Sequence, residues 1–319
     1  MQILTQLKYI IKKTVTLIIS LLLTSLVVFA AFSVIPGDAA ATKLGTNATA
    51  QQIEELREEM GLNDPVVVRY FNWLKDALKG DFGESLMYTG VTVNYLLSTR
   101  LPNTALLSLL AFMMIVVFSV PIGIFSAKRK SAPARGSITV LTQITMGIPS
   151  FFLGVLLTYL FSLTLRWFQL GNYPGFSESF PASVKYLIFP AIAIALPKIA
   201  MTSRFITTSI RSELHKDYVR TAYAKGCTRS GVLYKHVLKN SMVPVVTFMG
   251  VVVADIVAGS IIVEQVFSVP GIGSLLVTSI SNRDYTTASA VVLIIAFFII
   301  LVNFIVDMIY KAVDPRVEV

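Results

Sequence analysis

The stretch from Thr14 to Ile35 reads TVTLIISLLLTSLVVFAAFSVI and contains no charged residue. A helix that crosses a hydrocarbon core of about 30 Å needs about 20 predominantly apolar residues, and this stretch is long enough. Lys8, Lys12 and Lys13 precede it, as basic residues precede a secretory signal, but the apolar part of such a signal is only about 7–15 residues long. We therefore expect a retained transmembrane helix, with a signal peptide as the alternative.

Further along the chain, five more segments are apolar over similar lengths. They run approximately over Thr104–Ala127, Ile138–Leu165, Val184–Ile206, Met242–Phe267 and Thr287–Tyr310. Prolines fall within or beside these ranges, at Pro121, Pro149, Pro190 and Pro197. Membrane helices tolerate proline because neighbouring helices satisfy the freed backbone groups. The sequence thus predicts an all-α integral membrane protein with six transmembrane helices.

The composition of the chain agrees with a surface that faces lipid. Hydrophobic residues make up 55% of the 319 residues and charged residues only 14%, whereas a soluble domain carries about 25% charged residues. The net charge of +9 would suit nucleic acid only if the basic residues formed a patch on a soluble fold. Here they cluster in short stretches between apolar runs, so we expect surrounding membrane lipid and no nucleic-acid partner.

The placement of lysine and arginine predicts the orientation of the helices. Short cytoplasmic connections of membrane proteins carry an excess of these residues. One set of connections and both termini hold most of them, at Lys8, Lys12, Lys13, Lys128, Arg129, Lys130, Arg135, Arg211, Lys216, Arg220, Lys225, Arg229, Lys235, Lys239, Lys311 and Arg316. The opposite short connections hold only Arg166, Lys185 and Arg283. Both termini are therefore expected in the cytoplasm of the cell, with the chain crossing the cytoplasmic membrane several times.

The segment from Pro36 to Arg100 then lies outside the cell as an insertion after the first helix. It is long enough to fold, and it contains two amphipathic helical patterns. The first is Ala50–Met60, with Thr49 as N-cap and Gly61 as the stop, and the second is Pro65–Leu78, ended by Gly80. We expect an extracytoplasmic cap, so that residues 1–100 form the first helix plus cap and residues 101–319 form the core.

Residues for chemistry are scarce in this sequence. A GxxxxGK[ST] nucleotide loop is absent, and the dipeptide Gly-Lys does not occur, so the chain is not expected to bind or hydrolyse ATP. Cys227, His215 and His236 are its only cysteine and histidines, without disulfide or zinc spacing. We find no paired-carboxylate or Ser/His/Asp set. We therefore expect no enzyme activity, no catalytic residue, no metal and no cofactor.

The connection from Arg211 to Ser241 is long, basic and helical in pattern. Passive helix–helix connections are usually about 2–8 residues long. Its central part reads DYVRTAYAKG, where Asp217 suits a helix start and Gly226 suits the left-handed position after a helix end. A second helix, about Ser230–Asn240, would return the chain to the membrane.

The first of these two helices has an apolar face. Val219, Ala222 and Tyr223 fall together by i, i+3, i+4 spacing. Such a face can lie in the groove of a cytoplasmic partner. The alternative is an amphipathic loop that its lysines hold to anionic lipid at the membrane surface.

A resemblance to a known family separates these alternatives. Arg220-Thr221-Ala222, followed by Gly226, resembles the cytoplasmic coupling loop of binding-protein-dependent ABC importers, where Glu-Ala-Ala precedes a glycine by a fixed gap; the glutamate is absent here. The subgroup that the chain resembles is the peptide/nickel permeases, similar to the "B" subunits of dipeptide and oligopeptide importers. Further motifs of that subgroup occur in order: Ile35-Pro36-Gly37-Asp38, Gly80-Asp81-Phe82-Gly83-Glu84-Ser85, Arg100-Leu101-Pro102-Asn103-Thr104, Ile148-Pro149-Ser150-Phe151-Phe152, Val269-Pro270-Gly271-Ile272-Gly273, Arg283-Asp284-Tyr285, and Asn303, Asp307, Tyr310 and Asp314-Pro315-Arg316.

The resemblance implies an assembly around this chain. A second, homologous permease subunit would pair with it, two ABC ATPase subunits would bind the cytoplasmic loops together with ATP and Mg, and an extracytoplasmic solute-binding protein would deliver the substrate. It also implies which residues couple the chain to the ATPases: Asp217, Tyr218, Arg220, Thr221, Ala222, Ala224, Lys225 and Gly226. The expected function is ATP-driven import of short peptides. A nickel or metal–chelator importer is the alternative within the family, and an ion-coupled carrier or a membrane-embedded enzyme are alternatives outside it.

Two further groups of residues are candidates for the transport pathway. Lys198 and Asp255 are ionisable residues within the fourth and fifth apolar ranges, where charge is costly and usually paired or hydrated. Counted from the cytoplasmic ends of their helices, they lie within about 3 Å of the same depth. They are expected to face the pathway, paired with each other or touching the charged ends of a peptide, with bonds to freed backbone or to another subunit as the alternatives. Pro270, Gly271 and Gly273 interrupt the segment Phe267–Arg283. We expect a short re-entrant helix there at the outer mouth, which touches the binding protein or acts as an outer gate, with packing alone as the alternative.

Overall fold

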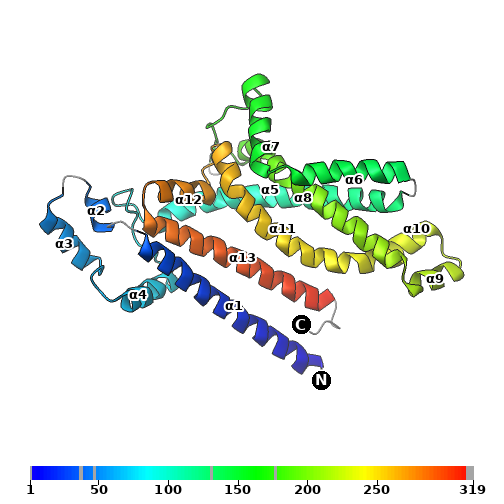
Figure 1. Ribbon diagram of the computed structural model, residues 1–319, viewed down its shortest axis with the longest axis horizontal. Helices are drawn as coiled ribbons and strands as arrows, with labels where there is room; N and C mark the ends of the chain where they lie inside the picture. Colours follow the sequence, from blue (N-terminus) through cyan, green and yellow to red (C-terminus); the bar gives the residue numbers. More distant parts are fainter. Residues whose placement is uncertain (1, 36–38, 46–47, 130–131, 176–177, 314–319) are drawn as a thin grey trace. The chain divides into compact units, whose positions relative to one another are not determined.

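In a computed structural model of the chain, residues 2–35, 39–45, 48–129, 132–175 and 178–313 are described. Their regular structure is helical, apart from an isolated bridge between Glu84 and Thr92. The order of elements (Figure 1) is α1 Gln2–Val34, α2 Ala39–Leu44, α3 Ala50–Glu59, α4 Val66–Leu78, α5 Val93–Lys128, α6 Ala132–Gly147, α7 Ser150–Leu157, η1 Thr158–Thr164, α8 Phe180–Leu214, α9 Asp217–Ala224, α10 Arg229–Gly231, η2 Val232–Val237, α11 Leu238–Val266, α12 Ile272–Ser281 and α13 Tyr285–Val313.

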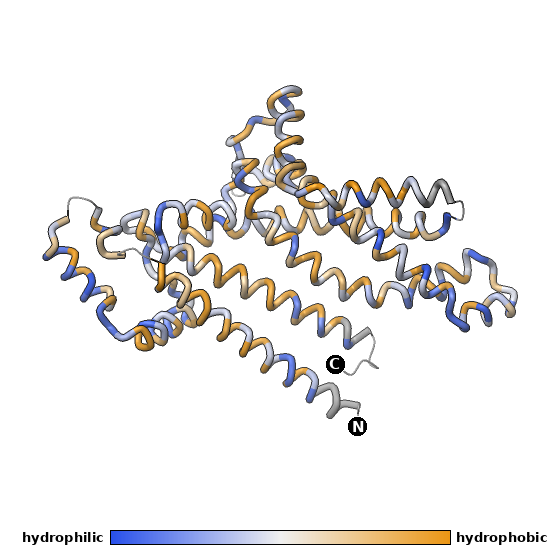
Figure 2. The backbone as a smooth tube through the Cα atoms, viewed as in Figure 1, coloured by the Kyte–Doolittle hydropathy of each residue, from blue (hydrophilic) through white to orange (hydrophobic). Residues whose placement is uncertain are grey.

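Within these residues, five helices are long and apolar enough to cross a membrane. They are Lys8–Val34, Val93–Lys128, Phe180–Leu214, Arg229–Val266 and Tyr285–Ile309. Figure 2 shows apolar residues along their length and polar residues gathered in α3 and around α9. The prediction of an all-helical membrane protein is therefore confirmed, and the prediction of six spans holds if a bent pair of helices counts as one.

That bent pair replaces the single third helix predicted over Ile138–Leu165. Gly136–Gly147 and Ser150–Thr164 meet at an angle of 90°. The break falls at Pro149, which caps α7 with extended backbone (φ −62°, ψ 140°). Proline lacks the N–H that a continuing helix needs, and it forces the preceding residue away from helical geometry.

The fifth span is longer than the sequence indicated. The predicted return helix, about Ser230–Asn240, is helical but does not end before the fifth span begins. It joins the fifth span in one helix, Arg229–Val266, which includes the wide turn η2. Pro244 lies inside this helix without ending it.

The described chain forms two compact units. The first comprises residues 1–104 and 269–301, and the second comprises 105–268 and 302–319. The segment 269–301 thus packs with the N-terminal part, whereas the sequence placed it with the core of 101–319. Each unit is described separately below.

In the first unit, the predicted cap helices form as expected. Thr49 accepts a hydrogen bond from the Gln52 backbone N–H in a reciprocal capping box, and Gly61 has a positive φ of 64°. Helix α4 packs on α1, where the hydroxyls of Ser25 and Tyr70 lie 2.9 Å apart. Phe29 of α1 also stacks edge-on against Tyr70, with ring centroids 5.4 Å apart.

The first unit also contains a buried carboxylate. Asp284 is 1% exposed and precedes α13. It accepts hydrogen bonds from the Ser85 hydroxyl (2.5 Å), the Leu86 N–H (3.1 Å), and both the N–H and the hydroxyl of Thr287 (3.1 and 2.7 Å). Four neutral donors thus hold this carboxylate, and it ties the segment around Ser85 to the start of α13.

In the second unit, α8 is the central helix and packs against α6, α7 and α11. Helix α5 approaches it closely at Gly123. A Cβ added there would lie 2.6 Å from Ile206 Cγ2, and the Gly123 carbonyl accepts a hydrogen bond from Thr207 Oγ1 (3.1 Å). Small residues allow such close contact between membrane helices.

Candidate coupling element and pathway residues

Helix α9, Asp217–Ala224, is the first of the two predicted loop helices, and it ends in a defined cap. Gly226 has a φ of 79°. Its N–H donates to the Tyr223 carbonyl (2.9 Å), and the Cys227 N–H donates to the Ala222 carbonyl (3.2 Å). These two bonds form a Schellman motif, which satisfies the last helical carbonyls. The prediction of a left-handed glycine at position 226 is confirmed.

The apolar face of α9 packs on the chain itself. Val219 (2% exposed) and Ala222 (8%) join a buried cluster with Ile206, Ile210, Val232, Leu233, Val237 and Val245 from α8, η2 and α11. The prediction that Val219 and Ala222 face a partner is therefore wrong, because helical periodicity finds an apolar face but not what covers it. Ala222 instead seats α9 on the ends of α8 and α11.

The opposite side of α9 is exposed. We call the exposed residues of α9 and its cap the α9 outer face: Asp217, Arg220, Thr221, Ala224 and Lys225 on this side, and Tyr223 at the edge of the apolar face. The Asp217 and Arg220 side chains are 96% and 82% exposed and only 3.7 Å apart. An exposed pair of this kind contributes little to stability. The outer face is thus a polar surface with two aliphatic or aromatic members, carried on a rigidly seated helix.

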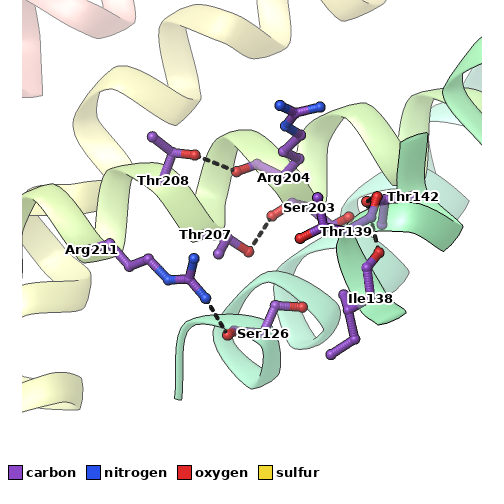
Figure 3. A pocket seen from close by; sticks show the side chains of 9 residues that line it. All are labelled: Ser126, Ile138, Thr139, Thr142, Ser203, Arg204, Thr207, Thr208 and Arg211. Atoms are coloured by element: carbon purple, nitrogen blue, oxygen red, sulfur yellow. Dashed lines mark hydrogen bonds between the residues drawn. The ribbon is translucent and has the colours of Figure 1, made fainter. Parts of the chain in front are cut away.

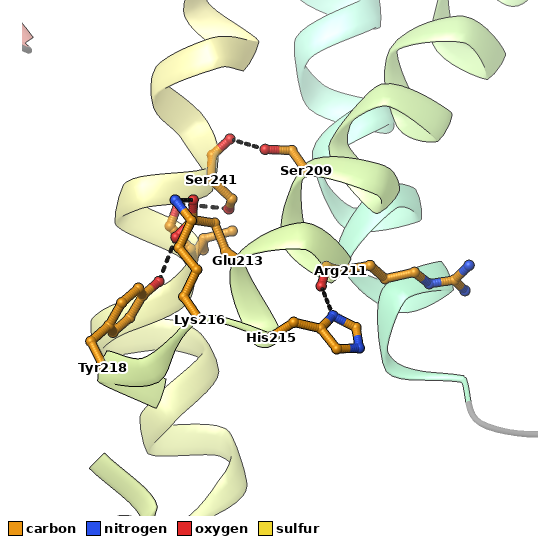
Figure 4. A network of polar contacts seen from close by, with 8 residues as sticks. Ser209, Arg211, Glu213, His215, Lys216, Tyr218 and Ser241 are labelled. Atoms are coloured by element: carbon orange, nitrogen blue, oxygen red, sulfur yellow. Dashed lines mark hydrogen bonds and ion pairs between the residues drawn. The ribbon is translucent and has the colours of Figure 1, made fainter. Parts of the chain in front are cut away.

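A polar network fixes the turn between α8 and α9 (Figure 4). The Glu213 carboxylate lies 2.5 Å from Lys216 Nζ and accepts a hydrogen bond from Tyr218 Oη (2.7 Å). Burial raises the pKa of Tyr218, and the hydrogen bond to Glu213 raises this pKa further. Nearby, Ser209 Oγ donates to the Ser241 carbonyl (2.7 Å), which joins α8 to α11.

Sequence reasoning did not single out Glu213. A signal was present, because Glu213 and Asp217 are the only acidic residues in the basic stretch 211–241. Of the two, the Asp217 side chain is exposed, whereas the Glu213 carboxylate pairs with Lys216 and accepts the hydrogen bond from Tyr218. Tyr218, which was predicted to contact the ATPase, is half-buried in this network and positions α9.

Lys198 of α8 and Asp255 of α11 form an ion pair in the second unit. Lys198 Nζ lies 2.5 Å from Asp255 Oδ2, and the side chains are 21% and 40% exposed. Neither side chain is sealed inside the unit, so the pair borders open space on the surface of these two helices. The pairing that the sequence left open is present; the role of these residues in a pathway stays a prediction.

The predicted outer-gate segment contains the short helix α12, Ile272–Ser281. Pro270 and Gly271 lead into it, and Gly271 and Gly273 have ordinary negative-φ backbone conformations. Asn103 Nδ2 donates to the Pro270 carbonyl (2.7 Å), and the Ile272 N–H donates to Thr104 Oγ1 (2.9 Å). Asn103 and Thr104 thus hold the start of α12, which explains the role of these two residues of the motif Arg100-Leu101-Pro102-Asn103-Thr104 in the fold.

The two parts of the chain match family descriptions. Residues 119–319 match the binding-protein-dependent transport system inner membrane component, and residues 6–108 match the N-terminal component of the same systems. The chain belongs to this family. It is therefore a permease component of a binding-protein-dependent transport system, and a multi-pass membrane protein. Such permeases are transport components and not catalysts.

Individual members of the permease family resemble the chain over nearly its whole length. It is 36% identical to a probable peptide ABC transporter permease protein of Sinorhizobium fredii over 310 residues, 97% of this chain and 99% of that protein. It is 36% identical to the oligopeptide transport system permease protein AppB of Bacillus subtilis over 312 residues, 97% and 99% of the two chains. It is 35% identical to the glutathione transport system permease protein GsiC of Escherichia coli over 313 residues, 98% and 99% of the two chains.

Proposed function

We propose that the chain is the permease subunit of an ATP-driven importer of short peptides. The observation that carries this proposal is the full-length similarity to permeases named for peptides, oligopeptides and glutathione, itself a peptide-like solute. A nickel or metal–chelator substrate, the alternative within the family, finds no comparable support. Among the described residues there is no group of three or more histidine, cysteine, aspartate or glutamate side chains that suits a metal ion.

The energy for transport comes from partner ATPase subunits, which bind ATP and Mg, and the α9 outer face is their contact. Helix α9 is seated by the cluster around Val219 and fixed by Glu213, so a force on its outer face reaches α8 and α11 directly. A loop that did not pack on these helices would move by itself and would not displace them. We therefore infer that the contact residues are Arg220, Thr221, Ala224 and Lys225.

The pathway lies beside the pair Lys198–Asp255, between this chain and a second, homologous permease. A peptide carries an ammonium group at one end and a carboxylate at the other. Asp255 and Lys198 offer one partner for each, and their partial exposure leaves both within reach of a solute. A solute-binding protein docks on the outer side, at the α12 segment around Pro270, Gly271 and Gly273.

The test is uptake by the complete complex in proteoliposomes with ATP at the ATPase side. Labelled di- and oligopeptides should enter with ATP, and a protonophore should not stop them. The purified chain alone should hydrolyse no ATP. Loss of uptake on adding the protonophore would show an ion-coupled carrier instead, and uptake of a nickel chelate in place of peptide would overturn the substrate.

The contact between the α9 outer face and the ATPase subunits is tested separately, by charge reversal. Arg220→Glu reverses a charge on the α9 outer face and should lower both ATPase binding and uptake. Lys239→Glu makes the same charge reversal at an exposed site outside that face and should leave both near the wild-type level. Equal effects of the two variants would contradict the assignment of the contact.

A further inference from the structure

The half of α8 that leads into α9 carries a polar face next to α6. Side chains from three helices line an open cavity of about 240 Å³ there (Figure 3). The lining residues are Ser126 of α5, Ile138, Thr139 and Thr142 of α6, and Ser203, Arg204, Thr207, Thr208 and Arg211 of α8. None of these lining residues is acidic, so the cavity is positively charged.

The two arginines differ in how they are held. Arg211 Nη2 donates to the Ser126 carbonyl (3.0 Å), which fixes its guanidinium at the cavity (Figure 3). Arg204 is exposed, and its guanidinium makes no hydrogen bond or ion pair within the part of the chain that the structure describes. The Thr207 and Thr208 hydroxyls donate to their own helix, at the carbonyls of Ser203 and Arg204 (2.8 and 3.1 Å). Arg204 thus has free donors that suit an oxyanion.

A second cavity continues from the first between the same three helices. Its volume is about 640 Å³, and its lining is almost entirely apolar. Four residues line both cavities, namely Ser126, Ile138, Thr142 and Ser203, and Leu141 and Leu196 are among the apolar residues that line the second. A positively charged end therefore opens directly onto an apolar groove.

We propose that these two cavities form one binding site for an anionic phospholipid. The phosphate of the headgroup binds Arg204 and Arg211, and an acyl chain lies in the groove along Leu141 and Leu196. Basic pockets between transmembrane helices bind anionic headgroups in this way. The predicted orientation places the site in the cytoplasmic leaflet. A peptide would use only the charged end, because its backbone would be left without hydrogen-bond partners in the apolar groove.

The test uses the complete complex in nanodiscs that contain a phosphatidylglycerol with a photoreactive acyl chain. After irradiation, mass spectrometry should map cross-links to residues 138–145 and 196–203. The same photoreactive chain on phosphatidylcholine should label these residues much less. Each arginine is expected to favour the anionic lipid by about fivefold.

The variants separate the headgroup contact from general charge. Arg204→Gln with Arg211→Gln should bring the ratio of phosphatidylglycerol to phosphatidylcholine labelling close to one. Lys235→Gln with Lys239→Gln removes the same charge from exposed positions outside the site and should leave the ratio unchanged. Equal loss in both double variants, or unchanged labelling in the arginine variant, would overturn the proposal.

Other occupants give different results. If the second permease subunit covers the groove, Leu141→Cys in a chain that also carries Cys227→Ser would form cross-links to that subunit, and lipid labelling would be absent. If a peptide carboxylate is the ligand, a peptide with a free C-terminus would displace the lipid label while its amidated form would not. Either result would overturn the lipid assignment, and neither would contradict peptide transport.

Discussion

At the scale of single residues, the conformation of Gly226 determines how α9 ends. Its φ of 79° costs little for glycine, but a β-branched residue there is strained by roughly 1 kcal/mol or more. The space around it is open, with no heavy atom within 4 Å of an added Cβ. The strain therefore arises from the backbone alone and not from a clash.

Gly226→Val should displace the end of α9 and uncouple ATP hydrolysis from uptake while the chain still inserts. Gly226→Asn is the matched control, because asparagine adopts the left-handed conformation more readily, and it should retain most of the coupling. The measurement is the ratio of peptide taken up to ATP hydrolysed in proteoliposomes. Normal coupling in the valine variant would show that α9 is not the coupling element.

The ion pair Lys198–Asp255 gives a second prediction for single residues. Lys198→Met leaves a partly buried carboxylate without its cation, which is worse than removing both charges. Uptake and yield of the complex should therefore be lower for Lys198→Met than for Lys198→Met with Asp255→Leu. Asp255→Leu alone completes the comparison. If the losses in the two single variants simply add in the double variant, the two residues act independently.

At the scale of helices, the approach of α5 to α8 at Gly123 limits what the second unit tolerates. A Cβ at this position would lie 2.7 Å from Ile206 Cβ and 3.0 Å from the Ser203 carbonyl. Gly123→Ala should therefore force the helices apart and lower stability by about 1–3 kcal/mol. Gly136→Ala adds the same methyl group in open space and should be neutral or stabilising. Thermal unfolding of the purified complex compares them, and equal melting temperatures would contradict the close crossing.

Helices are also where sequence-based prediction succeeded and failed for physical reasons. The membrane-spanning helices could be predicted from the apolar composition of their segments. The start of α3 at Thr49 and the end of α9 at Gly226 could be predicted from the capping preferences of these residue types. The break at Pro149 could not be predicted, because a proline in a membrane helix is tolerated or breaks the helix according to its neighbours. The burial of Asp284 could not be predicted from the sequence either, because its hydrogen-bond partner Ser85 lies 199 positions away.

At the scale of the whole molecule, the predicted orientation places α12 outside the cell and α9 inside. Val277 and Ile280 are 39% and 50% exposed on α12, and Tyr223 is 44% exposed on α9. In a chain with Cys227 replaced by serine, Val277→Cys and Ile280→Cys should react with an impermeant thiol reagent added to intact cells. Tyr223→Cys should react only after the membrane is opened. The reverse pattern would invert the topology and with it the assignment of α9 to the ATPases.

The continuous helix from Arg229 to Val266 limits where the chain can change length during evolution. One residue inserted within its regular part would rotate everything beyond it by about 100°, because an α-helix has 3.6 residues per turn. An insertion between the cluster at Val237 and Asp255 would carry Asp255 away from Lys198. The wide turn η2 is no exception, because Val232, Leu233 and Val237 belong to the buried cluster that seats α9. Insertions and deletions in related chains should therefore avoid the stretch from Val232 to Asp255, which keeps a constant length, and collect in the connections between helices.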